Sequence, residues 1–311
     1  MTRVTDVQRF GKVAVLFGGD SAEREVSLQS GRAVHTALRA RGVDAHLVDT
    51  QTVRLPDLPA HHYDRCWNAL HGGAGEDGTV AAVLSVLGLP VTGSGMLASA
   101  LAMDKERSKK VLAQSGVPVP QTIALNSAVP PAESVYPLFV KPVDGGSSIA
   151  ARPVQSVSDW ADAYASAAAA GNGVLVEPLL SGPEYTVGVL QGQVLPAIRI
   201  EVASEFYDFD AKYVSDTTRF ICPGVEDEAL AARIADIALR SFDALGCSGW
   251  GRVDLMMTAG GEPLVLEVNT VPGMTSHSLV PCAAKVAGID FETLCWRILE
   301  TSFLSGEAND E

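Results

Sequence analysis

Two segments near the C-terminus, 251–254 and 264–269, constrain the fold of this chain most. Both are short and contain strand-forming residues such as Val and Leu. The pair Gly260-Gly261 lies between them, and adjacent glycines permit the tight turn of a hairpin. We therefore predict that the two segments are neighbouring strands of one sheet.

Polar residues recur at every second position of this predicted hairpin. Side chains alternate faces along a strand, so Arg252 and Asp254 share one face, as do Glu267 and Asn269 on the next strand. If the two faces coincide, three oxygen ligands and one guanidinium converge. Oxygen ligands without nearby His or Cys suit a hard cation such as Mg²⁺. A solvated sheet face is the alternative, but the second strand is otherwise apolar on both sides.

Composition places the chain among globular proteins. Its 311 residues are enough for two or three subdomains, and 47% of them are hydrophobic. A run of about 18 apolar residues does not occur, and the first residues lack the apolar core of a secretory signal, so we expect no membrane association. The five cysteines are scattered without a CxxC pair, which is typical of reduced thiols in a cytosolic protein.

The net charge of −14 makes nucleic acid an improbable partner. An acidic protein that handles a polyanion must instead place a few cations locally. The sequence offers candidate lysines for that purpose, in the central part of the chain.

Strands alternate with helices over the first ~90 residues, which predicts a parallel, doubly wound sheet. Beyond residue 116 the pattern changes to strands and helices of mixed order, without internal repeats. We expect strands at 13–17, 43–48, 63–70, 121–125, 138–141, 174–177, 184–190 and 194–201, and helices ending at Gly42 and spanning 79–87, 104–115, 158–170 (with Ser158 as N-cap) and 226–245.

A lysine at a strand end precedes a Gly/Ser loop in the central region. Lys141 is followed by Gly145-Gly146-Ser147-Ser148, whose backbone N–H groups and hydroxyls can bind phosphate oxygens. The loop differs from a Walker A loop because its lysine comes before the glycines. Most such loops are mobile hairpin tips, but the lysine and the downstream oxygen ligands favour ATP binding. Lys105 is a second candidate phosphate cation, although alone it would pass for a solvated helix charge.

An acidic segment follows the predicted strand at 174–177. Glu177 and Glu184 flank the point where the strand ends, so the segment can offer backbone edges to adenine and a carboxylate to ribose. A strand that simply leaves the core at Pro178 explains this segment equally well when it is taken alone.

With these parts in this order, the chain resembles the D-alanine–D-alanine ligases, which belong to the ATP-grasp family. The resemblance runs from Val13 to about Leu299. The stretches that carry it are GGDSAEREVS at 18–27, ALHG at 69–72, GEDGT at 75–79, TGSG at 92–95, MDK at 103–105, SGPEYTV at 181–187, YDFDAKY at 207–213, GWGRVD at 249–254 and NTVPGMTSHSLVP at 269–281.

The resemblance implies an α/β chain with the ATP-grasp fold: an N-terminal doubly wound parallel-sheet domain and two α+β subdomains. The implied boundaries are 1–93 for the N-terminal Rossmann-like domain, 94–176 for a central subdomain with the phosphate flap, and 177–311 for a C-terminal subdomain with the metal and substrate sites. ATP is expected between the latter two.

The implied reaction is the ligation of two D-alanines to D-alanyl-D-alanine, for peptidoglycan precursors in the cytoplasm. ATP phosphorylates the carboxylate of the first D-alanine, and the amine of the second attacks the acyl phosphate. Family members are usually homodimers, and the sequence itself neither supports nor opposes that state.

Roles at the nucleotide are also implied by the resemblance. Asp254, Glu267 and Asn269 are expected to hold two Mg²⁺ ions, with Mn²⁺ as a possible substitute. The phosphates are expected to face three lysines and the loop that covers them. These residues are Lys105, Lys141, Lys212, Ser147 and Ser148, and the residues implied around adenine and ribose are Glu177, Leu180, Glu184 and Phe206.

For the amino acids, the resemblance implies that Glu23 holds the ammonium group of the first D-alanine, although Glu23 alone reads as a helix N-terminal acid. Arg252 and the Gly273 N–H are expected at the oxyanion and the transferring phosphate. The remaining implied contacts are His71 and Glu76 at the rim of the first subsite, and Ser278 and the Leu279 N–H at the carboxylate of the second D-alanine.

Tyr213 lies in a segment, roughly 205–220, that relatives use as a mobile loop. It is expected to meet Ser147 and Glu23 in a triad that closes the site and favours an amine over D-lactate as nucleophile. Gly73, Gly145 and Pro178 depart from residues common in the family, which puts adenine contacts and the phosphate flap in question.

Three other interpretations compete with this one. A related ATP-grasp ligase would use a different nucleophile, such as D-lactate. A nucleotide-binding module without catalysis would have no use for Arg252. A periplasmic-type amino-acid-binding protein would fit two domains and a small ligand. We do not favour it, because the sequence shows no secretory signal and such a protein would not need the metal hairpin.

Overall fold

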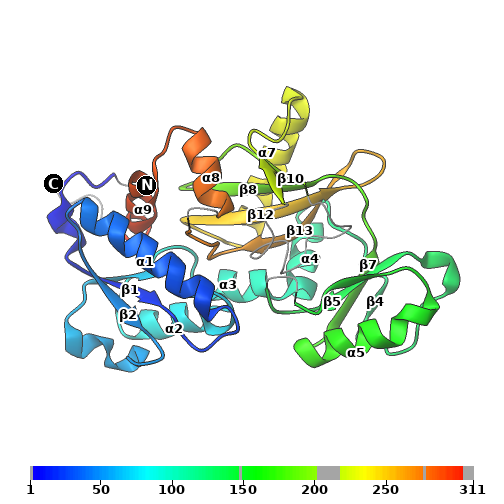
Figure 1. Ribbon diagram of the computed structural model, residues 1–311, viewed down its shortest axis with the longest axis horizontal. Helices are drawn as coiled ribbons and strands as arrows, with labels where there is room; N and C mark the ends of the chain where they lie inside the picture. The colour runs from blue at the N-terminus through cyan, green and yellow to red at the C-terminus, as the bar shows by residue number, and fades with distance from the viewer. Residues whose placement is uncertain (1–2, 147–148, 202–217, 276–277, 304–311) are drawn as a thin grey trace.

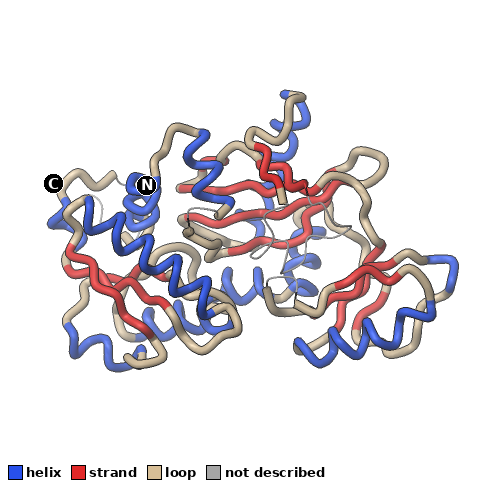
Figure 2. Tube along the Cα trace, viewed as in Figure 1, coloured by secondary structure: helices blue, strands red, loops and turns tan. Residues whose placement is uncertain are grey.

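The computed structural model describes residues 3–146, 149–201, 218–275 and 278–303. Sheets follow one another along the molecule, each with helices packed against it (Figures 1 and 2). In the described part of the chain, no helix is long and apolar enough to cross a membrane.

The N-terminal sheet has the strand order β2-β1-β3, all parallel, as predicted. Its strands are β1 (Lys12–Phe17), β2 (Asp44–Asp49) and β3 (Arg65–Asn68). β1 is buried on both faces, because Val13 and Val15 pack toward helix α1 (Arg24–Ala40) while Ala14 and Leu16 pack toward α2 (Thr79–Val86). This packing confirms the doubly wound arrangement.

The central sheet has the order β4-β7-β5-β6 and is antiparallel. One face packs Leu138 and Val140 against helix α5 (Trp160–Ala170). The opposite face of β5 and β7 carries charged residues that belong to the site below. The strands are β4 (Ala124–Leu125), β5 (Leu138–Pro142), β6 (Arg152–Val154) and β7 (Val174–Pro178).

The C-terminal sheet follows the order β11-β10-β8-β12-β13, with β9 paired to β8. Its core face packs Val253 and Leu255 of β12 against α7 (Glu228–Ala244). The predicted hairpin is confirmed, since β12 and β13 pair antiparallel through a turn in which Gly261 has a positive φ of 82°. The strands are β8 (Glu184–Leu190), β9 (Gln193–Val194), β10 (Ile198–Glu201), β11 (Arg219–Ile221), β12 (Trp250–Met257) and β13 (Pro263–Asn269).

Two helical segments join parts of the molecule that are distant in sequence. Helices α3 (Met96–Met103) and α4 (Lys105–Gln114) pack on the core of the C-terminal sheet. α8 (Leu279–Val286) and α9 (Phe291–Glu300) follow that sheet, and α9 returns to pack on α1 (Figure 1). The domain boundaries at 93 and 176 remain a prediction.

Some expected elements differ in detail. Helix α5 begins at Trp160 after a 3-10 turn, and the N-terminal capping box is formed by Ser156 with Asp159, so Ser158 is not the N-cap. The strand expected at 194–201 is divided into β9 and β10, with a gap at the Pro196 region, because proline has no N–H to donate to a ladder. Helix α3 had no counterpart in the prediction.

Candidate active site

The predicted oxygen ligands meet on neighbouring strands. Asp254 of β12 lies opposite Glu267 of β13, and Arg252 lies opposite Asn269. The Arg252 guanidinium donates to the Asp254 carboxylate at two points, Nε to Oδ1 at 2.8 Å and Nη2 to Oδ2 at 2.7 Å. Thr186 of β8 also donates to Asp254 Oδ1, at 2.5 Å. The register therefore places Arg252, Asp254, Glu267 and Asn269 on one face of the sheet, as predicted.

The donor set fits a divalent cation. Two carboxylates and one amide oxygen are hard ligands of the kind that Mg²⁺ prefers. In the described residues, no group of three His, Cys, Asp or Glu side chains is close enough to hold a metal ion, so an ion at Asp254 and Glu267 would take its other ligands from groups such as the Asn269 amide, water or phosphate oxygens. Asn269 is fixed in place, since its Oδ1 accepts the Val271 N–H at 2.9 Å.

Lys105 connects the sheet face that carries Asp254 and Glu267 to the glycine loop. It is the first residue of α4, whose N-cap is Asp104. Its Nζ donates to the Gly145 carbonyl at 2.7 Å and lies 3.4 Å from Glu267 Oε2. Its backbone N–H donates to the Val143 carbonyl at 2.9 Å, so the start of α4 is fixed against the segment that leads into the loop.

A cavity of about 520 Å³ lies between the central and C-terminal sheets. Its polar lining includes side chains from both sheets and the backbone of the glycine loop. Apolar side chains cover the remaining walls, an arrangement typical of a site for a small molecule or cofactor. Residues that line it include Lys105, Lys141, Glu177, Leu180, Glu184, Asp254 and Glu267, with Phe139, Ile200, Met256 and Leu266 among the apolar ones.

Two lysines enclose the carboxylate of Glu177 on the charged face of the central sheet. Lys141 Nζ lies 2.6 Å from Glu177 Oε2, and Lys109 Nζ forms an ion pair with Oε1. Burial works against the charge of Glu177, but the two ammonium groups outweigh it and lower its pKa. Burial, aided by the charge of Lys141, lowers the pKa of Lys109 to about 7.

Sequence reasoning missed Lys109. The available signal was its position four residues after Lys105, since residues four apart lie on the same face of a helix. The lysine belongs to the run Lys109-Lys110, which reads as an ordinary solvated helix surface, and its burial depends on how α4 packs.

Glu23 lies at the other end of the site, at the N-cap position of α1, where its side chain makes no capping hydrogen bond. It is buried, and its carboxylate lies against Gly72 and Gly146. Gly72 has a positive φ of 67°, and a Cβ there would come within 2.5 Å of Glu23 Oε2, so both conformation and space require glycine. The Gly72 N–H donates to Glu76 Oε1 at 3.0 Å, which brings the two acids to the same loop.

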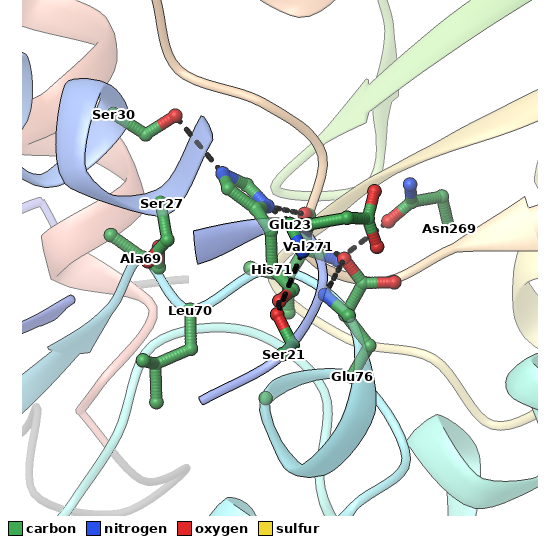
Figure 3. Close-up of polar contacts among 12 residues, drawn as sticks. Ser21, Glu23, Ser27, Ser30, Ala69, Leu70, His71, Glu76, Asn269 and Val271 are labelled. Carbon is green, nitrogen blue, oxygen red and sulfur yellow. Dashed lines mark hydrogen bonds and ion pairs between the residues drawn. The ribbon is translucent and has the colours of Figure 1, made fainter. Parts of the chain in front are cut away.

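Figure 3 shows the side chains of Glu23, Glu76 and Asn269 turned toward one another. Glu23 and Glu76 come from the N-terminal domain, whereas Asn269 ends β13. Acidic and amide oxygens from both parts of the chain therefore face a common space, and such a space suits an ammonium group.

His71 fastens these two parts together. Its Nε2 lies 2.9 Å from Ser30 Oγ, and its Nδ1 lies 3.1 Å from the Val271 carbonyl. Ser30 Oγ also accepts the Met274 N–H at 3.1 Å (Figure 3 shows Ser30, His71 and Val271). His71 is buried, and its side chain packs between the N-terminal domain and the 271–274 segment.

Gly273 and Ser278 are brought together before helix α8. A Cβ on Gly273 would lie 2.8 Å from Ser278 Oγ. Ser278 Oγ accepts the Thr275 N–H at 2.9 Å, and Ser278 is the N-cap residue of α8 without a side-chain cap bond to the helix. The first N–H groups of this helix, beginning at Leu279, therefore lie next to a hydroxyl and a glycine, a combination suited to an anion.

Several predicted site residues lie outside the described part of the chain. These are Ser147, Ser148, Phe206, Lys212 and Tyr213. The departures Gly73, Gly145 and Pro178 are described: Gly73 and Gly145 have positive φ, and Pro178 ends β7 beside Glu177.

Comparisons with known proteins agree on one group of enzymes. The family model described as D-ala D-ala ligase C-terminus matches residues 111–300. The D-alanine–D-alanine ligase of Methylococcus capsulatus is 47% identical over 97% of this chain and 99% of its own length. That of Marinobacter nauticus is 50% identical over 96% of this chain and 94% of its own.

Solved structures give the same result. The D-alanine–D-alanine ligase of Bacillus anthracis, complexed with ATP, superposes with a TM-score of 0.80 at 33% identity, over 94% of this chain and 97% of that one. The VanG D-Ala:D-Ser ligase of Enterococcus faecalis superposes with a TM-score of 0.79 at 29% identity, over 94% and 99%. The expected ATP-grasp fold is thereby confirmed.

Proposed function

The chain belongs to the D-alanine–D-alanine ligase family, and we propose that it joins two D-alanine molecules to D-alanyl-D-alanine at the expense of ATP, for peptidoglycan precursor synthesis. The observation that carries this proposal is that Gly146 borders both parts of the site. Gly146 lines the cavity together with Lys105, Asp254 and Glu267, and the Glu23 carboxylate lies against it.

In this proposal ATP occupies the cavity between the central and C-terminal sheets. Leu180 and Glu184 lie around adenine and ribose together with Glu177, and Phe206 completes the ring contacts. Lys105, Lys141 and Lys212 face the phosphates, while the loop of Gly145, Ser147 and Ser148 covers them. The support within the described residues is that two of these lysines, Lys105 and Lys141, line the cavity. The acidic residues Glu177 and Glu184 line it as well.

Asp254, Glu267 and Asn269 would hold two Mg²⁺ ions, or Mn²⁺ in their place. When bound, these ions neutralise phosphate charge and align the group that is transferred. Lys105 pairs with Glu267, and Arg252 pairs with Asp254, so the chain places two of its own cations next to the proposed metal ligands.

The first D-alanine binds with its ammonium group at Glu23, and its subsite is bordered by His71 and Glu76. Its carboxylate oxygen attacks the γ-phosphorus, and the bond from that phosphorus to the ADP oxygen breaks. Arg252 donates to the phosphoryl oxygens, and the Gly273 N–H donates to the carboxyl oxygen that gains charge in the second step.

The second D-alanine binds with its carboxylate at Ser278 and the Leu279 N–H. Its neutral amine attacks the acyl carbon, phosphate leaves, and the amine proton is released. Tyr213, Ser147 and Glu23 would close the site during these steps, because water that entered would hydrolyse the acyl phosphate.

The test measures dipeptide, ADP and phosphate after incubation of the purified chain with ATP, Mg²⁺ and D-alanine. We expect equal amounts of all three, and none with L-alanine. D-lactate and D-serine are added in turn beside D-alanine, because a mixed product that exceeds D-alanyl-D-alanine would identify a ligase for a different nucleophile. ATP hydrolysis without any ligated product would contradict the proposal.

The proposed compartment is the cytoplasm, where ATP is available, and all the cysteines (Cys66, Cys222, Cys247, Cys282 and Cys295) are free thiols there. A homodimer is the proposed assembly, on family resemblance alone, and sedimentation velocity would measure it.

A further inference from the structure

Lys109, Glu177 and Lys141 form a buried group that we call the Lys-Glu-Lys cluster. Their exposed fractions are 4%, 2% and 7%, respectively. Lys141 and Glu177 line the nucleotide cavity, whereas Lys109 is absent from the described residues that line it. The ammonium group of Lys109 contacts the Glu177 oxygen that Lys141 does not use. The lysine therefore contacts the lining of the cavity through Glu177 and does not face the cavity itself.

Below its pKa of about 7, Lys109 is charged, and the cluster then holds two ammonium groups and one carboxylate, with one net positive charge. Lys141 and Glu177 alone would be neutral. Burying charges is costly, and a buried ion pair is a weak source of stability. A second buried lysine therefore adds a cost that a purely structural pair would not need, and this cost points to a role in binding an anion.

The cluster is assembled from two parts of the chain. Glu177 lies on β7 opposite Phe139 of β5, and Lys141 follows two residues later on the same face of that strand. Lys109 comes from α4, a helix that is fixed in the core of the C-terminal sheet through Leu112. The position of Lys109 is thus set by one wall of the cavity and that of Glu177 by the other.

We propose that Lys109 is a positioning residue for nucleotide binding, which neutralises Glu177 from behind so that Lys141 keeps its positive charge for the phosphates. This inference rests on the proposed function, in which the cavity holds ATP and Lys141 faces its phosphates. Without Lys109, the Glu177 carboxylate would be left to Lys141 alone, and that ammonium group would be held as half of a neutral pair.

The test compares the affinities of ADP and adenosine, measured by calorimetry, in Lys109→Met and in wild type. Met keeps the length of the side chain but removes the charge. The matched control is Lys110→Met, since Lys110 is the next residue of α4, is exposed, and pairs with Glu106. We expect Lys109→Met to weaken ADP binding about tenfold while adenosine binding changes by less than about twofold, because one unit charge near the phosphates is lost.

A compensating variant separates charge from structure. In Lys109→Met/Glu177→Gln, Lys141 has no carboxylate partner, so its charge is again available to the phosphates. The preference for ADP over adenosine should therefore return to the wild-type ratio. Equal weakening of ADP and adenosine in Lys109→Met, or no recovery in the double variant, would overturn the proposal. If Lys109→Met does not fold, the double variant, which removes two of the three buried charges, decides alone by the same ratio.

Measurements on the wild-type protein separate the role of Lys109 from the nucleotide site and the ligase activity. Wild-type protein that binds neither ADP nor adenosine contradicts the nucleotide site itself, and with it the premise of the inference. Wild-type protein that binds and ligates normally, together with an unchanged ADP-to-adenosine ratio in Lys109→Met, leaves the ligase activity in place and overturns only the role of Lys109.

Discussion

Arg252 and Asp254 hold each other through a two-point contact on one face of β12, with donor–acceptor distances of 2.8 and 2.7 Å. A paired guanidinium and carboxylate have a planar, defined geometry, so the direction of the arginine is fixed by the same residue that is proposed as a metal ligand. The Arg252 guanidinium is therefore already oriented to donate to the negative charge that develops during the proposed reaction.

The first prediction concerns the shape of that donor. Arg252→Lys should lower kcat by about 10²–10³, because an ammonium group cannot replace the planar donor at the charge that develops during reaction. The KM for ATP should change little. The control is Arg199→Lys, a half-exposed arginine of β10 that pairs with Glu201. A loss expressed only in KM would contradict the role assigned to Arg252.

Thr186 is predicted to position a metal ligand. It donates to Asp254 Oδ1 at 2.5 Å from the neighbouring strand and is buried. Thr186→Val keeps the shape of the side chain and removes this donor, so the Mg²⁺ concentration for half-maximal activity should rise about 10–100-fold. Direct titration of Mn²⁺ binding by electron paramagnetic resonance gives a readout that is independent of turnover. Thr36→Val, on the exposed side of α1, is the control, and equal metal affinities in both variants would refute the prediction.

Space beside Ser278 is predicted to matter for the second amino acid. A Cβ at Gly273 would come within 2.8 Å of Ser278 Oγ, so Gly273→Ala must displace that hydroxyl. We expect the KM for D-alanine at the acceptor subsite to rise about tenfold, as a displaced carboxylate donor would cause. Initial rates over a wide range of D-alanine concentration measure it. Gly260→Ala in the hairpin turn is the control, because a Cβ there meets nothing closer than 3.6 Å. An unchanged acceptor KM would exclude Ser278 from that subsite.

A pH-dependent contribution to stability is predicted at Asp49. The hydrogen bonds from Arg24 lower the pKa of Asp49 from 3.8 to about 2. A carboxyl group whose pKa is lowered by folding stabilises the protein above its unfolded pKa, and this contribution is lost as the pH falls from about 4 toward 2. Asp49→Asn should therefore lower Tm by about 2–4 °C at pH 7, and by less at each step below pH 4.

Thermal unfolding followed by circular dichroism at pH 7, 5, 4 and 3 tests this dependence. The exposed Asp57 provides the control variant Asp57→Asn. A Tm difference for Asp49→Asn that stayed constant down to pH 3 would show that the ion pair with Arg24 does not contribute as described.

The sequence was most informative where strand alternation acts on charged residues. The period of two placed Arg252, Asp254, Glu267 and Asn269 on common faces, and the turn at Gly260-Gly261 allowed the two faces to coincide. Parallel pairing of β1 was predictable because strands and helices alternate along the N-terminal part of the chain. These features depend on local pattern alone.

Other features depend on packing between distant segments, which local pattern does not contain. Lys109 reads as a surface lysine until α4 is placed against Glu177, and helix α3 is too uniformly apolar to show a helical period. The capping box at Ser156 was missed because a 3-10 turn precedes α5. His71 is a loop histidine in sequence, and its contact with Val271 becomes visible only when the domains are packed.

We propose that this site transfers a phosphoryl group from ATP to the carboxylate of D-alanine before the peptide bond forms. The most direct measurement uses D-alanine with ¹⁸O in its carboxylate and analyses the released phosphate by mass spectrometry. We expect one labelled oxygen in each phosphate formed, because the carboxylate oxygen leaves with phosphorus when the amine attacks. Unlabelled phosphate alongside D-alanyl-D-alanine would contradict it.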